Sequence, residues 1–132
     1  MAEATMKIML PYPVETVWQV VTDVRNYGWR SDVMHAKVIN ENQFVEVDRE
    51  GIRTVYTVVD YATKRRWELD LDNDNVHGRW IATFEADGLH TVFSIEEELM
   101  AKKVIMKPFL KTNVSKKVST YMEDLKRVLK YQ

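Results

Sequence analysis

The chain has 132 residues, of which 45% are hydrophobic and 11% aromatic, and this size and composition predict one domain over residues 1–132 with one core. Its 19 basic and 20 acidic side chains leave a formal net charge of -1, so no overall field favours nucleic acid as a partner. Cysteine is absent, which excludes disulfides and thiolate chemistry, and the lack of a long apolar run or a signal peptide predicts a cytoplasmic protein without a membrane span.

The first predicted elements are a strand and a short helix. Residues 5–10 alternate polar and apolar side chains, which is the period of a half-buried strand. Pro13 suits the first turn of a helix, because its missing N–H would have no partner there in any case. Apolar side chains then recur at three- and four-residue steps, which predicts an amphipathic helix ending at about Asp23.

The middle of the chain, from Lys37 to Lys102, predicts six consecutive strands. Alternating apolar and polar runs are separated by short turn sequences, of which Asp87-Gly88 is the strongest turn signal. Loops this short permit only hairpins, so the strands should form an antiparallel meander. In the strand over residues 76–86 one face is apolar and consists of Val76, Gly78, Trp80, Ala82 and Phe84.

The chain ends in a long predicted helix. After Pro108 the apolar side chains follow a helical period for about 22 residues and leave one charged face. The order of elements predicts an α+β fold with the helices on one side of an antiparallel sheet. One helix cannot fill a strongly twisted sheet of seven strands, so we expect a ligand cavity between them, enlarged where the small Gly78 and Ala82 face inward. The alternative is a collapsed core in which side chains fill this space.

Three motifs carry a resemblance to a known superfamily. They are P-x-E-x-V-W at residues 13–18, N-Y-x-W-R-S-D at 26–32 and M-K-P-F-L-K at 106–111. Together with the order of elements they resemble the helix-grip superfamily of START domains and birch-pollen allergens, and most closely its bacterial polyketide cyclase/dehydrase-like group. The resemblance implies a helix-grip fold, in which a seven-stranded curved antiparallel sheet wraps around the long C-terminal helix and two short helices follow strand 1. It also implies a hydrophobic cavity, since members bind lipids, sterols, hormones or polyketides and a few catalyse aldol cyclisation.

Arg30 and Glu97 are the candidates for chemistry. Arg30 lies in the aromatic segment 26–33 and is either a structural residue paired with Asp32 or the backbone, which we favour, or an anchor for an anion or carbonyl at the cavity mouth. Glu97 shares the apolar face of its strand, where burial would suit a general acid or base. The alternative, which we favour over the catalytic role, is that Glu97 reaches solvent or pairs with a basic residue.

The predicted lining of the cavity is apolar. It consists of Tyr56, Gly78, Trp80, Ala82, Phe84, Phe93, Phe109, Val118 and Met122. The three histidines show no metal-ligand spacing, and the acidic segment 70–75 lacks the glycine and closing glutamate of a calcium loop. We therefore expect neither a metal nor an organic cofactor.

The expected function is binding or transport of a small hydrophobic ligand, a lipid or a polyketide-like molecule, between the sheet and the C-terminal helix. One alternative is a cyclase or dehydratase in which Arg30 holds a carbonyl and Glu97 transfers protons. Another is an interaction module whose groove receives an apolar peptide. An enzyme needs at least two polar groups converging in the cavity, whereas a carrier needs only the lining. The expected oligomeric state is a monomer or a weak homodimer.

Overall fold

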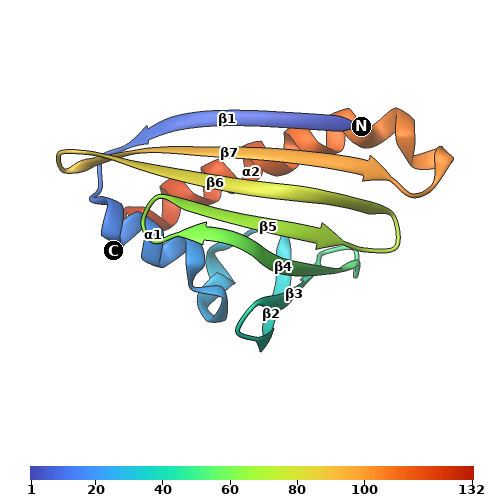
Figure 1. Cartoon of the computed structure of the whole chain (residues 1–132), viewed down its shortest axis with the longest axis horizontal. Coiled ribbons are helices and arrows are strands. Elements are labelled where there is room, and N and C mark those ends of the chain that lie inside the picture. Colours follow the sequence, from blue (N-terminus) through green and yellow to red (C-terminus); the bar gives the residue numbers. More distant parts are fainter.

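The structure, a computed structural model, describes all 132 residues. The chain folds into a curved sheet with helices on its concave side (Figure 1). The elements are β1 (Ala2–Leu10), α1 (Val14–Thr22), η1 (Val24–Trp29), β2 (Val33–Asn40), β3 (Gln43–Asp48), β4 (Arg53–Ala62), β5 (Arg66–Asp72), β6 (Val76–Asp87), β7 (His90–Ala101), η2 (Val104–Phe109) and α2 (Leu110–Leu129). Here η denotes a 3-10 helix.

The seven strands form one antiparallel sheet in the order β1-β7-β6-β5-β4-β3-β2. Strands β2 to β7 are the predicted meander, and β1 returns to pair with β7. The predicted turn at Asp87-Gly88 joins β6 and β7, where Gly88 adopts the positive φ of 60° that favours glycine. The predicted α+β helix-grip architecture is therefore confirmed.

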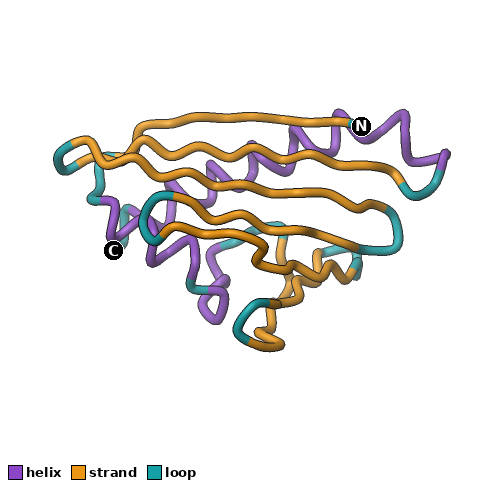
Figure 2. The backbone as a smooth tube through the Cα atoms, in the orientation of Figure 1, coloured by secondary structure: helices purple, strands orange, loops and turns teal.

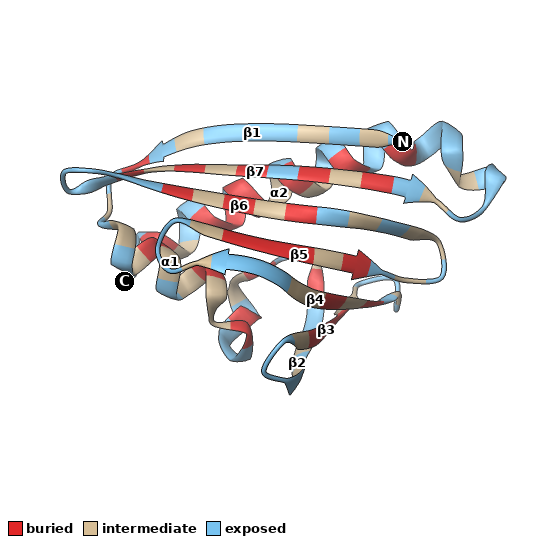
Figure 3. Ribbon diagram, viewed as in Figure 1, coloured by how far each residue is buried: buried red, intermediate tan, exposed pale blue.

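Helix α2 lies along the concave face of the sheet, as the backbone trace shows (Figure 2). Its apolar stripe is buried and consists of Leu110, Val114, Val118, Tyr121, Met122, Leu125 and Leu129. Buried positions alternate with more exposed ones along β6 and β7, so the inner face of the sheet and this stripe share one core (Figure 3). No helix has the length and apolar composition needed to cross a membrane.

The predicted cavity-enlarging role of Gly78 is wrong. A Cβ atom added there would collide with the main-chain oxygen of Glu98 and lie 2.9 Å from Cδ2 of Leu99, both on the adjacent strand β7. Gly78 therefore marks a close approach of β6 to β7 and opens no space toward α2. Ala82 does face inward, but it is fully buried among core side chains.

Candidate functional site

A small cavity lies between α2 and the part of the sheet formed by β3 to β7. Its lining comes from seven elements or their ends and consists of Tyr27, Arg30, Phe44, Glu46, Tyr56, Trp67, Leu69, Trp80, Glu97, Lys117 and Tyr121. The empty space among them holds roughly one water molecule. The cavity expected between the sheet and α2 is thus narrow, and its lining includes four charged side chains, Arg30, Glu46, Glu97 and Lys117.

The strand register places the lining side chains in rows on the concave face. Leu69 on β5 lies opposite Trp80 on β6, and Trp80 lies opposite Glu97 on β7. A second row begins on β3, where Phe44 lies opposite Tyr56 on β4 and the two rings stack at 5.0 Å between centroids. Because side chains alternate between faces, these residues point inward with no local signal other than their spacing of two.

The aromatic rings form most of the walls. Phe44 also stacks on Trp67, with centroids 5.9 Å apart, and Trp67 meets Trp80 edge to face at 6.0 Å. Tyr121 of α2 closes the aromatic set by packing against Trp80, with 5.3 Å between ring centroids. Planar apolar surfaces therefore surround the polar groups of the cavity on the sheet side and the helix side.

Arg30 is buried and makes charged contacts on two sides. Its Nη1 donates to Oε2 of Glu46 at 3.1 Å, and its Nη2 lies 3.6 Å from Oδ1 of Asp32. The guanidinium carbon also lies 4.5 Å from the ring centroid of Tyr121, which is a cation–π contact. Burial alone lowers the pKa of Arg30, but the charge of Glu46 and further neighbours raise it above the ordinary value. The favoured structural pairing with Asp32 is present, and Arg30 also faces the cavity.

Glu97 is fully buried and pairs with a lysine of α2. Lys117 Nζ donates to Oε2 of Glu97 at 3.0 Å and to the hydroxyl of Tyr56 at 3.1 Å. The Lys117 side chain is 31% exposed, so it lies at the boundary between the cavity and solvent. Burial is the largest single effect and lowers the pKa of Lys117, but Glu97, Tyr56 and Glu46 together raise it above the ordinary value, so the amine stays protonated. Glu97 therefore pairs with a basic residue, as the favoured alternative predicted, and this pair lies in the lining of the cavity.

Tyr27, Tyr56 and Tyr121, the three cavity tyrosines, are all buried. Burial is the main cause that raises the pKa of each phenol above its ordinary value. Their hydroxyl groups differ in their partners. Tyr27 donates to the main-chain oxygen of Val21, and Tyr56 accepts from Lys117, whereas the Tyr121 hydroxyl makes no hydrogen bond within the protein.

Three polar atoms of the cavity residues have no hydrogen-bond partner in the protein. They are Nε of Arg30, Oε1 of Glu97 and the hydroxyl of Tyr121. A buried polar atom without a partner costs on the order of 1–3 kcal/mol, so each of these atoms favours a bound group that supplies the missing bond. The set contains one donor, one acceptor and one hydroxyl that can do either. The arrangement can therefore bind a molecule that carries several oxygen atoms.

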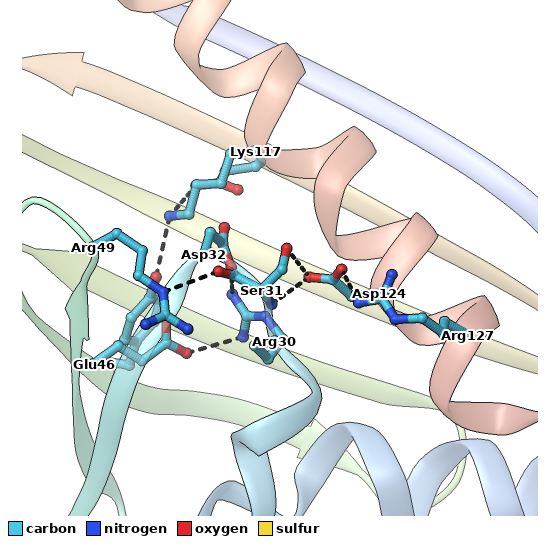
Figure 4. Close-up of polar contacts among 10 residues, drawn as sticks. Arg30, Ser31, Asp32, Glu46, Arg49, Lys117, Asp124 and Arg127 are labelled. Atoms are coloured by element: carbon cyan, nitrogen blue, oxygen red, sulfur yellow. Dashed lines mark hydrogen bonds and ion pairs between the residues drawn. The ribbon is translucent and has the colours of Figure 1, made fainter. Parts of the chain in front are cut away.

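A second polar cluster fixes the segment that carries Arg30 against α2 (Figure 4). The main-chain N–H and the hydroxyl of Ser31 donate to Oδ2 of Asp124 at 2.7 and 2.9 Å. Arg127 donates to the other oxygen of Asp124 at 2.6 Å, and Arg49 of the β3–β4 turn donates to the main-chain oxygen of Ser31 at 3.2 Å. The position of Arg30 is thus set by bonds on the residue that follows it. These bonds explain why polar residues follow the aromatics in segment 26–33.

The structure brings together four of the residues predicted for the site. Arg30, Glu97, Tyr56 and Trp80 all line the cavity. Other predicted lining residues are buried in the core but do not face the cavity, namely Ala82, Phe84, Phe93, Val118 and Met122. The prediction for Phe109 is wrong, because its side chain is 58% exposed in η2 and points away from the core.

Sequence reasoning missed Glu46 and Lys117, although both carry a signal. Glu46 lies two residues after the inward-facing Phe44, just as Glu97 follows an inward apolar residue on β7. Lys117 lies three residues after Val114 and four before Tyr121, which places it on the apolar stripe of α2. A charged residue at a position whose spacing demands an apolar one is the signal that identifies both.

One group of carboxylates lies close enough together to share a cation. Glu3 of β1 and Glu96 and Glu98 of β7 have oxygens within 4.8 Å of one another. They lie at exposed or half-exposed positions, and the cavity lining includes none of them. This group is therefore separate from the site described above.

Comparison with known proteins identifies a family and a fold. Residues 1–130 match the model of the family described as polyketide cyclase/dehydrase and lipid transport. A START superfamily protein from Mycobacterium smegmatis superposes with a TM-score of 0.89 over 100% of both chains at 14% identity. A conserved protein from Geobacillus kaustophilus gives a TM-score of 0.84 at 12% identity over 98% of this chain and 95% of its own.

A third similar structure is DynU16, a protein of the dynemicin biosynthetic locus. It superposes with a TM-score of 0.74 at 16% identity over 98% of this chain, which spans 48% of the DynU16 chain. No curated protein is significantly similar to the chain in sequence. At identities this low, the superpositions establish a common fold and nothing more. The family match, in contrast, covers nearly the whole chain.

Proposed function

Because the chain belongs to the polyketide cyclase/dehydrase and lipid transport family, we propose that it binds a small hydrophobic molecule rich in carbonyl or hydroxyl oxygens. The binding site is the cavity between α2 and the sheet. The observation that carries the proposal is that three residues lining one aromatic cavity, Arg30, Glu97 and Tyr121, each have a buried polar atom without a partner. An aliphatic lipid tail would leave these atoms without partners, so oxygen-bearing ring systems fit better.

The balance of charge in the cavity favours an uncharged ligand. Within the lining, two cations, Arg30 and Lys117, face two carboxylates, Glu46 and Glu97, and each cation pairs with one of them. Arg30 also contacts Asp32, which lies outside the lining. A charged ligand would leave one unit of buried charge uncompensated, which is costly at low dielectric. A ketone, phenol or quinone would accept or donate hydrogen bonds without disturbing these pairs.

Binding requires the cavity to open, because its present space holds roughly one water molecule. The bonds from Ser31 hold α2 at Asp124, in its C-terminal half. Opening is therefore expected further toward the N-terminal end of α2, where Lys117 lies between the cavity and solvent. A side-chain rotation of Lys117 breaks only two hydrogen bonds, those to Glu97 and Tyr56.

A second candidate function is cyclisation of a polyketide-like chain, favoured by the unpartnered oxygen of Glu97 in a cavity that Arg30 and Lys117 also line. Glu97 would take a proton from the carbon between two ketones, and Arg30 or Tyr121 would donate to the resulting enolate oxygen. The enolate carbon then forms a bond with a second carbonyl carbon, and the proton returns to the new alkoxide. Loss of water would complete a dehydration.

The ligand proposal is tested with two tyrosine variants. Tyr121→Phe removes a buried hydroxyl that has no partner, so stability should rise or stay the same, while affinity for an oxygenated ligand should fall about fivefold to tenfold. Tyr27→Phe is the matched control, because its hydroxyl is already bonded to Val21. That variant should lose stability and keep the affinity ratio between ligands.

Affinity is measured with two ligands of the same shape, a dihydroxyanthraquinone and anthracene, by quenching of Trp67 and Trp80 in the lining. The oxygenated ligand should bind the wild-type protein more tightly, and Tyr121→Phe should reduce that preference. Equal binding of the two ligands would favour a plain hydrophobic carrier. Absence of binding by either, with no copurified molecule in native mass spectrometry, would refute a ligand site.

The cyclisation candidate needs a separate experiment with a linear poly-β-ketone. Wild-type protein should accelerate formation of the cyclised product, and Glu97→Gln should abolish the acceleration while retaining binding of the dihydroxyanthraquinone. Product formation at the uncatalysed rate with wild-type protein would leave binding as the only function of the cavity.

A further inference from the structure

The segment that joins β7 to α2 exposes several large apolar side chains. Val104 and Ile105 of η2 are 79% and 74% exposed, and Phe109 at its end is 58% exposed. No residue of η2 is buried, so these side chains contribute nothing to the core. Met100 at the end of β7 is also 57% exposed. We call these four side chains, together with Lys102, Lys103 and Lys107 between them in the sequence, the η2 patch.

The η2 patch lies in the most basic part of the chain. Residues 99–122 contain six of the 19 basic side chains and none of the 20 acidic ones. The rest of the chain therefore carries 13 basic and 20 acidic side chains, an excess of seven negative charges. Positive charge is thus concentrated on this segment although the whole protein is close to neutral.

The six basic side chains of residues 99–122 are all lysines, and most of them are free of carboxylate partners. Lys103, Lys107, Lys111 and Lys116 form no ion pair, while Lys102 pairs with Asp72 at 2.6 Å. Lys111 is held by the main-chain oxygen of Glu3, to which it donates at 2.9 Å. The charges therefore remain available for an external partner.

The η2 patch occupies one end of the molecule. In Figure 1 the β7–α2 connection projects beyond the strands, at the end opposite the C-terminus. Figure 3 shows the same connection almost entirely in the colour of exposed residues. A flat surface can therefore contact the patch without touching the remainder of the sheet.

We propose that the η2 patch docks the protein on an anionic lipid surface. Exposed Val104, Ile105 and Phe109 would enter the boundary between headgroups and acyl chains, and the surrounding lysines would bind acidic headgroups. Apolar side chains framed by lysine, in a segment that itself contains no acidic residue, match this partner in both polarity and charge. The proposal does not depend on what the cavity binds, because none of the patch residues lines it.

The experiment is cosedimentation with vesicles of phosphatidylcholine, either pure or mixed with phosphatidylglycerol. The wild-type protein should bind the mixed vesicles, release them at high salt and bind pure phosphatidylcholine far more weakly. Lys103→Gln with Lys107→Gln should weaken binding about 25-fold, since each lysine near the surface is worth about fivefold. Ile105→Ser with Phe109→Ser should reduce binding at any salt concentration.

Matched controls come from exposed residues outside the patch. Met9 and Leu89 are 58% and 77% exposed, and Lys37 and Lys130 are exposed lysines. Met9→Ser with Leu89→Ser, and Lys37→Gln with Lys130→Gln, should bind the mixed vesicles as the wild-type protein does. Equal losses in the control and patch variants would overturn the proposal.

Two further results would also overturn it. One is an absence of wild-type binding to the mixed vesicles. The other is a wild-type dimer, seen by light scattering, that Ile105→Ser with Phe109→Ser converts to a monomer, because a second copy would then cover the patch. Cavity binding measured with the dihydroxyanthraquinone is independent of all these outcomes, so failure of one proposal leaves the other standing.

Discussion

Replacing Lys117 by methionine tests the energetics of the cavity most directly. The 3.0 Å separation of Lys117 Nζ from Oε2 of Glu97 corresponds to a Coulomb energy of about 5 kcal/mol at an effective dielectric constant of about 20. Partial exposure of Lys117 reduces this value, and loss of one partner of a buried pair costs about 3–5 kcal/mol. We therefore expect Lys117→Met to lower the free energy of unfolding by about 3 kcal/mol.

Substitution of the other partner of this ion pair, Glu97, should lower the free energy of unfolding much less. In Glu97→Gln the lysine loses its partner, but its side chain is already 31% exposed and can turn toward water. The expected loss is about 1 kcal/mol, and the double variant should lie near Glu97→Gln because its cavity contains no uncompensated carboxylate. Lys126→Met is the control, since its pair with Glu123 is exposed and should contribute less than about 1 kcal/mol.

Urea denaturation followed by tryptophan fluorescence and circular dichroism gives these free energies. A coupling energy of about 3 kcal/mol between the two positions would support the pairing. Single variants with equal and additive losses would refute the asymmetry, and with it the assignment of Glu97 as a carboxylate inside the cavity.

Three further predictions concern packing and pH. Gly78→Ala should lower stability by at least about 1–3 kcal/mol because its Cβ meets Glu98, whereas Gly28→Ala, with open space around it, should be nearly neutral in the same urea assay. Ala82→Leu, which would fill a cavity if one were present there, should instead cost about 1–3 kcal/mol and leave the affinity for the dihydroxyanthraquinone unchanged. The three cavity tyrosines have raised pKa values in the folded state, so the stability that they contribute is complete below about pH 10 and is lost as the pH rises further. Tyrosinate absorbance should therefore show these three phenols ionising only with alkaline unfolding, and their ionisation in folded protein would contradict their burial.

The sequence by itself determined the architecture. Alternation in β2 to β7, the turn at Asp87-Gly88 and the apolar stripe of α2 are local patterns, and local patterns predict the type and order of elements. Order and short loops then leave an antiparallel meander as the arrangement of the strands. The inward direction of Glu97 also followed from its spacing from Phe93 and Ile95, because alternation holds whatever residue occupies the position.

Only the tertiary structure decided the character of the cavity. Glu46 and Tyr56 on β3 and β4 lie far along the chain from Glu97 and Lys117 on β7 and α2, and their contacts depend on the curvature of the sheet and the angle of α2. A single sequence contains no information on those distances. It therefore does not show whether an inward-facing glutamate such as Glu97 is unpaired or forms a buried ion pair. The space at Gly78 was likewise decided by how closely β7 approaches, which is a property of strand packing. The aromatic side chains of β3 to β6 then fill the concavity that a twisted sheet leaves around one helix, and the polar groups are confined to a space of roughly one water molecule.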